Sequence, residues 1–153
     1  MQSQRTLGTA LRHLLSLLDD ELYDVYRADG LAYRPRYTPV VRALREIGPA
    51  SIKQIAAHAG MTHSAVSQTI TQMTGAGWVS ADRGADGRER IVDLTPELIG
   101  ILPLLEKRWQ ATNAAASTLD RELPYALTKL VADAIKALEQ NPFSARIREE
   151  EES

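Results

Sequence analysis

The spacing of apolar residues predicts a mainly α-helical chain with a small β wing. Leucines recur every three or four positions over residues 3–28 and predict a helix that ends at Asp29-Gly30. A long helix is expected over 96–118, bent or broken by Pro103, and a last one over 124–140. Two short apolar runs, 78–79 and 91–94, flank Asp86-Gly87 and predict two strands joined by a hairpin.

Polar caps and glycines predict three shorter helices in the middle of the chain. Each begins at a residue whose hydroxyl can cap a helix, namely Thr38, Ser51 and Thr62. Each is followed by glycine: Gly48, Gly60, and the pair Gly75 and Gly77. Gly60 lies where a left-handed residue is expected to end the helix. The third helix has Val66, Ile70 and Met73 as its buried stripe. Helix, tight turn, helix and hairpin is the order of a winged helix-turn-helix.

Charge is unevenly distributed along the 153 residues, although the net charge is only −2. Residues 33–95 contain eight Lys or Arg against five acids, a net of +3, whereas both ends are acidic. We therefore expect a winged helix-turn-helix over 33–95 that faces a polyanion. Residues 1–32 and 96–142 are expected to form a helical dimerisation region, and residues 143–153 a charged, disordered tail.

Composition excludes several classes of protein. The chain has no cysteine, which excludes disulfides and thiolate metal sites. His58 and His63 lie on different predicted elements without an evident acidic partner, so we expect no metal and no cofactor. The sequence contains no nucleophile elbow of the form G-x-S-x-G and no evident acid–base pair, so we do not expect an enzyme. With neither a long apolar run nor a secretory signal, we expect a cytoplasmic protein without a membrane partner.

The outer face of the third short helix is polar and carries no fixed charge. It presents hydrogen-bonding side chains at helical spacing: His63, Ser64, Ser67, Gln68 and Thr71. Such a helix can enter the major groove of DNA and contact base edges or phosphates. The alternative interpretation is an ordinary solvated helix face. The cations at the hairpin tip, Arg83, Arg88 and Arg90, likewise suit DNA or simply form a solvated turn.

Residues 38–96 resemble the winged-helix core of the MarR family of bacterial and archaeal regulators. The resemblance rests on an I-A-x-x-x-G-M-T turn at 55–62, V-S at 66–67, G-W-V at 77–79, D-x-R at 86–88 and L-T at 94–95. The chain departs from the family pattern at Gln68 and Gln72, where arginine is frequent, and at Thr74, where an acid is frequent.

The resemblance implies a homodimeric, sequence-specific regulator that binds a pseudo-palindromic operator in double-stranded DNA and acts as a ligand-released repressor. It implies DNA contacts from the helix-turn-helix and the wing: Lys53, Thr62, His63, Ser64, Ser67, Gln68, Thr71, Gln72, Arg83, Arg88 and Arg90. It also implies that Asp86 orients Arg88 towards the DNA. The alternative function is a winged-helix module for protein interaction or architecture that recognises no specific operator.

A cluster of tyrosines and arginines lies just before the helix-turn-helix. It comprises Tyr23, Tyr26, Tyr33, Arg34, Arg36 and Tyr37. In the family an effector crevice lies near this stretch, and these side chains would suit a small aromatic or phenolic anion. The alternatives are aromatic packing where helices meet, and arginines that flank DNA.

Overall fold

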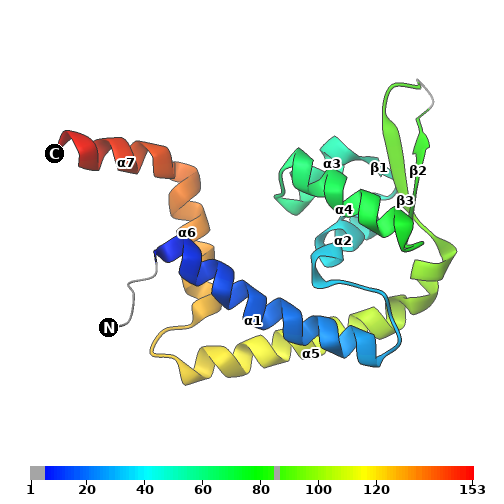
Figure 1. The fold of residues 1–153 in the computed structure, drawn as a ribbon, viewed down its shortest axis with the longest axis horizontal. Helices are drawn as coiled ribbons and strands as arrows, with labels where there is room; N and C mark the ends of the chain where they lie inside the picture. Colours follow the sequence, from blue (N-terminus) through cyan, green and yellow to red (C-terminus); the bar gives the residue numbers. More distant parts are fainter. Residues whose placement is uncertain (1–5, 85–86) are drawn as a thin grey trace. The chain divides into compact units, whose positions relative to one another are not determined.

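The fold consists of seven α-helices and three short strands among the residues that the computed structural model describes, 6–84 and 87–153 (Figure 1). In chain order these are α1 (Leu7–Ala28), α2 (Thr38–Ile47), β1 (Ala50–Ser51), α3 (Ile52–Ala59), α4 (His63–Gly75), β2 (Val79–Arg83), β3 (Arg90–Leu94), α5 (Pro96–Glu122), α6 (Leu127–Gln140) and α7 (Phe143–Glu152). The prediction of a mainly α-helical chain with a β wing is confirmed. Two compact units divide the chain between Ile101 and Leu102.

The sheet of the first unit has three antiparallel strands in the order β1-β3-β2. Strands β2 and β3 form the expected hairpin, with Val79 opposite Leu94 and Arg83 opposite Arg90. Strand β1 was not predicted, because two residues are too short to show an alternating pattern. Ser51 belongs to β1 and also caps α3, so the wing is joined directly to the helix-turn-helix.

The ends of the two short helices form as predicted. The Ser51 hydroxyl accepts a hydrogen bond from the Gln54 N–H at 3.2 Å, and the Gln54 side chain accepts one from the Ser51 N–H at 2.9 Å. Gly60 ends α3 in the left-handed conformation with φ 64°. The Thr62 hydroxyl accepts from the Ala65 N–H at 3.1 Å and caps α4. These local contacts hold the turn between α3 and α4.

The start of α2 differs from the prediction. A single 3₁₀ turn over Pro35–Tyr37 runs directly into the helix, so Thr38 is already helical and Tyr37 is the N-cap. Because it no longer caps the helix, the Thr38 hydroxyl instead hydrogen-bonds the Tyr33 hydroxyl at 3.0 Å. Gly48 ends α2 with φ 76°, as expected.

Helix α5 ends four residues later than the predicted 118, and α6 begins three residues later than the predicted 124. Helix α5 continues through Pro103, so the alternative of a break there is wrong, and the alternative of a bend stays a prediction. The missing N–H of proline removes one hydrogen bond, which a 27-residue helix tolerates. Helix α6 lacks a side-chain N-cap of its own, and Asp120 supplies one: its carboxylate accepts from the Thr128 N–H at 3.1 Å and the Thr128 hydroxyl at 2.6 Å.

The charged tail is a helix, α7, rather than the expected disordered segment. Its Ala, Arg and Glu residues are strong helix formers, which outweighs the repulsion expected among the acids. Arg146 also ties α7 to the end of α6, because its guanidinium donates to the carbonyls of Asn141 and Ala137 at 3.1 and 3.2 Å. Along the described parts of the chain, no helix is long and apolar enough to cross a membrane.

Candidate nucleic-acid interface

Helix α4 has one buried and one exposed side. Val66, Ile70 and Met73 are buried as predicted, and Thr69 joins them as a buried residue that the apolar pattern did not reveal. The other side exposes polar side chains, namely His63, Ser64, Gln68, Thr71 and Gln72, with Ser67 half-buried. The helix is therefore held rigidly along its apolar stripe while its polar face stays accessible.

Some polar groups on this face already form hydrogen bonds within the protein, and others do not. The Thr71 hydroxyl donates to the Ser67 carbonyl at 3.0 Å, and the Thr74 hydroxyl donates to the Ile70 carbonyl at 2.8 Å. Within the described residues, no hydrogen bond engages the side-chain amides of Gln68 or Gln72. Thr71 can therefore accept from a ligand without further change, whereas each glutamine amide can both donate and accept.

The wing places two cations opposite each other. Arg83 on β2 and Arg90 on β3 are register partners, so both side chains lie on the same face of the hairpin. Asp82 lies on the opposite face from Arg83, since successive strand residues alternate. Among residues 6–84 and 87–153, neither arginine forms an ion pair with Asp82 or Glu89.

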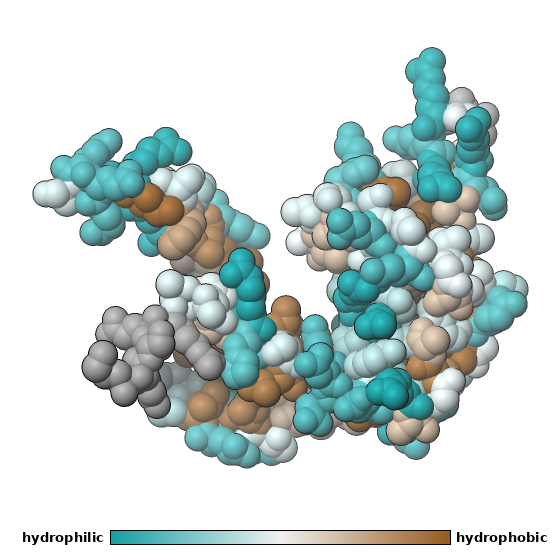
Figure 2. Space-filling model, in the orientation of Figure 1, coloured by the Kyte–Doolittle hydropathy of each residue, from teal (hydrophilic) through white to brown (hydrophobic). Residues whose placement is uncertain are grey.

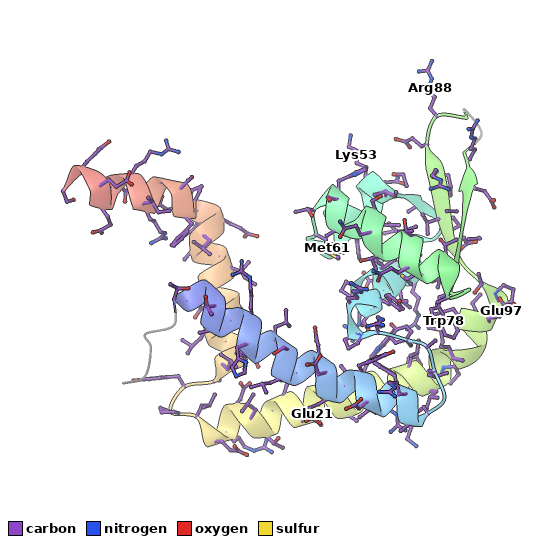
Figure 3. The ribbon with its side chains drawn as sticks, viewed as in Figure 1. Glu21, Lys53, Met61, Trp78, Arg88 and Glu97 are labelled. Atoms are coloured by element: carbon purple, nitrogen blue, oxygen red, sulfur yellow. The ribbon has the colours of Figure 1, made fainter. Side chains whose placement is uncertain are left out.

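Backbone hydrogen bonds join described residues near the tip of the wing. The Gly84 N–H donates to the Glu89 carbonyl at 2.6 Å, and the Gly87 N–H donates to the Gly84 carbonyl at 2.9 Å. Gly87 has φ 69°, a conformation that residues with a side chain rarely adopt. Figure 3 shows Arg88 at the far end of this hairpin. Asp86, the expected brace of Arg88, lies outside the described residues.

Two contacts from the base of the wing hold it to the rest of the unit. The Trp78 indole N–H donates to the Ala32 carbonyl at 2.8 Å, and the Thr95 hydroxyl donates to the Gly77 carbonyl at 2.7 Å. The Leu98 N–H in turn donates to the Thr95 hydroxyl at 3.3 Å, which caps α5. Sequence reasoning singled out Gly77, Trp78 and Thr95 as motif matches but predicted none of these contacts.

Cationic and polar side chains share one side of the winged unit. Lys53 on α3 and Arg88 on the wing point to the same side of the unit in Figure 3. Figure 2 shows hydrophilic side chains gathered over the hairpin end. Arg83, Arg88 and Arg90 are all exposed, as is Lys53. A polyanion that lies across this side would meet positive charge from two separate elements.

His58 has an acidic partner that sequence reasoning missed. Its Nε2 lies 2.6 Å from a carboxylate oxygen of Glu46, which joins α3 to α2. The two residues are separated along the chain and meet only because α2 packs against α3. His63, by contrast, is exposed at the first turn of α4.

Three of the four tyrosines in this cluster form part of the core. Tyr26, Tyr33 and Tyr37 are buried and make edge-to-face contacts, with ring centroids 4.8 and 5.5 Å apart. Trp78 extends the cluster at 6.4 Å from Tyr33. Burial raises the pKa of the Tyr33 phenol, which keeps it neutral. These three rings thus pack as the alternative interpretation expected.

The remaining members of the cluster lie nearer the surface. The Arg34 guanidinium sits over the ring of half-buried Tyr23 at 4.6 Å from its centroid, and the Arg27 guanidinium lies at 5.8 Å. Arg36 is exposed on the 3₁₀ turn. Of the cluster that was expected to bind an effector, the accessible part is therefore the Tyr23 ring with the Arg34 guanidinium over it.

Comparison with known proteins shows what the winged unit is similar to. The model of the MarR family matches residues 33–89. A regulator of Bacillus subtilis (strain 168), the uncharacterized HTH-type transcriptional regulator YwoH, is 32% identical over 84 residues. That alignment covers 55% of this chain, and the chain spans only about half, 56%, of the length of this relative.

Solved structures show the same fold at low sequence identity. The Mycobacterium tuberculosis regulator MOSR, solved in complex with DNA, has a TM-score of 0.70 and 16% identity, with 91% of this chain and all of that chain covered (100%). Reduced AbfR bound to DNA has a TM-score of 0.61 and 18% identity, covering 88% and 89%. PcaV of Streptomyces coelicolor, in complex with its natural ligand, has a TM-score of 0.60 and 18% identity, covering 92% and 99%.

Proposed function

We propose that this protein is a homodimeric, sequence-specific DNA-binding transcriptional regulator, since residues 33–89 match the model of the MarR family. The observation that carries the proposal is the pairing of Arg83 with Arg90 on a slender hairpin, beside a helix that exposes only uncharged polar groups. Two adjacent guanidiniums suit phosphates or a narrow minor groove, and the polar helix suits base edges.

The contacts divide by the part of the DNA that they address. We assign direct base contacts to the α4 face, with Ser64, Gln68 and Gln72 as its outermost row. Lys53 on α3 and the hydroxyls of Thr62 and Ser67 are assigned to phosphates, as is His63 at the helix start. Arg83, Arg88 and Arg90 are assigned to the backbone and minor groove, where they add affinity for any sequence.

Exposed apolar faces support the homodimer. Helix α1 exposes large apolar side chains along its length: Leu7, Leu11, Leu15, Leu17, Leu18 and Val25, with Leu15 56% exposed. In the second unit, α6 and α7 expose another set: Leu130, Val131, Ile135, Leu138, Phe143 and Ile147, with Ile135 54% exposed. Figure 2 shows hydrophobic side chains over α7 and the adjoining part of α6. A second copy related by two-fold symmetry would cover them and present two winged units to half-sites about one DNA turn apart.

DNA binding is tested with the region upstream of the protein's own gene. A labelled duplex is titrated by fluorescence anisotropy at several salt concentrations, with a scrambled duplex of equal composition as control. The proposal expects tighter binding to the native sequence and an affinity that falls with salt. Equal binding to both duplexes would favour the architectural alternative, and no binding to either would contradict a DNA-binding function.

The regulatory part of the proposal is a repressor that a small aromatic or phenolic anion releases from DNA. The Tyr23 ring with Arg34 over it supports this, since it offers stacking and positive charge together. The ligand-bound structure of PcaV is a precedent for the fold. A thermal-shift screen of aromatic carboxylates, followed by anisotropy of the DNA complex, tests it. Compounds that bind without changing DNA affinity would contradict the release mechanism.

A further inference from the structure

The exposed face of α4 lacks the side chains that usually read guanine. No Lys, Arg, Asp or Glu occurs in His63–Gly75, and the exposed groups are hydroxyls, one imidazole and two amides. Guanine presents two acceptors in the major groove, O6 and N7, which a single Arg or Lys binds with two hydrogen bonds. Helix α4 offers no such cation to a base.

The two glutamine amides match adenine instead. Adenine presents an acceptor, N7, beside a donor, the N6 amine, and an amide can donate to the first and accept from the second. Gln68 and Gln72 are both exposed, and neither amide has a hydrogen bond within the described part of the chain. The Thr71 hydroxyl between them already donates to the Ser67 carbonyl, so it cannot also offer that hydrogen to a base.

The spacing of the two glutamines indicates how far apart their bases lie. Four helical residues return to the same face, and at about 1.5 Å rise per residue they are about 6 Å apart along the axis. Bases of one strand are about 3.4 Å apart. From this geometry we infer that Gln68 and Gln72 read two adenines, one or two base steps apart, in each half-site. This inference rests on the proposed function and specifies the DNA it recognises.

The test removes one acceptor atom from the DNA. The preferred half-site is first selected from randomised duplexes, and each adenine is then replaced by 7-deazaadenine, which lacks N7 but still pairs with thymine. Two positions, one or two steps apart, are expected to lose about 5-fold or more in affinity. Gln68→Ala should make one position insensitive to the replacement, and Gln72→Ala the other. Alanine is a strong helix former, so both variants should fold, which thermal unfolding checks.

The control is Gln110→Ala, which removes an exposed glutamine from α5, outside the helix-turn-helix. It should leave both sensitive positions unchanged. A selected half-site with guanines in place of the two adenines overturns the inference but leaves the DNA-binding function intact. Sensitivity to 7-deazaadenine that neither Gln68→Ala nor Gln72→Ala alters would also overturn the inference and leave the DNA-binding function intact. Selection that enriches no sequence overturns both the inference and the sequence-specific function on which it rests.

Discussion

Replacing Arg90 with glutamine should weaken DNA binding and at the same time slightly stabilise the free protein. Arg90 and Arg83 are exposed register partners on β3 and β2. Like charges directly opposite each other destabilise a strand pair, but the same two charges attract phosphates. One substitution therefore acts in opposite directions on folding and on binding.

Both magnitudes follow from the position of the pair. Cross-strand pairs are worth about 0.2–1 kcal/mol. Because Arg90 is exposed, Arg90→Gln should lie near the lower end, a stabilisation of about 0.3 kcal/mol or about 1 °C in Tm. Each lost phosphate contact reduces the slope of log K against log salt by about 0.9. With two wings in the proposed dimer, the slope should fall by about 1.8.

Two measurements check this prediction. Anisotropy over a salt series gives the slope, and calorimetric melting of the free protein at low salt gives the stability. Arg148→Gln on α7 is the matched control, because it removes an exposed arginine outside the winged unit and should alter neither the slope nor DNA affinity. An unchanged slope for Arg90→Gln would remove Arg90 from the interface. A lower Tm would refute the repulsion argument.

Four further outcomes are expected. Trp78→Phe keeps an aromatic ring but removes the N–H that donates to the Ala32 carbonyl, so urea denaturation should show a loss of about 1–3 kcal/mol; an unchanged stability would mean that this contact does not anchor the wing. Hydrogen bonds from Thr128 lower the pKa of Asp120, so Asp120→Asn should be less stable than wild type at neutral pH. The difference should begin to shrink as the pH falls below about 4, and melts from pH 7 to pH 3 check the sign. Arg88→Ala should weaken binding to all duplexes in anisotropy, most where A·T-rich sequence flanks the site, and equal affinity would exclude a wing contact. Deleting residues 1–25 should yield monomers or aggregates in light scattering, whereas a well-behaved dimer would refute the assigned interface.

The family resemblance implied more of the site than could be derived from the residues alone. The polar face of α4 and the cationic hairpin followed from spacing and composition. The roles of Lys53 and Asp86 came only through matching motifs. The residue types of the tyrosine cluster were equally compatible with a ligand crevice and with a packed core. The structure shows that Tyr26, Tyr33 and Tyr37 are buried, whereas Arg34 is exposed.

What the sequence by itself determined was local. The caps at Ser51 and Thr62 and the buried stripe of α4 were predicted correctly, because each depends on residues three or four positions apart. What only the tertiary structure decided was which distant surfaces meet: β1 against β3, and Trp78 against Ala32. Strand β1 has too few residues to show an alternation of apolar and polar positions. A hydrogen bond between residues far apart in the chain produces no periodic pattern in the sequence. Such contacts form only once the packing of helices and strands brings the partners together.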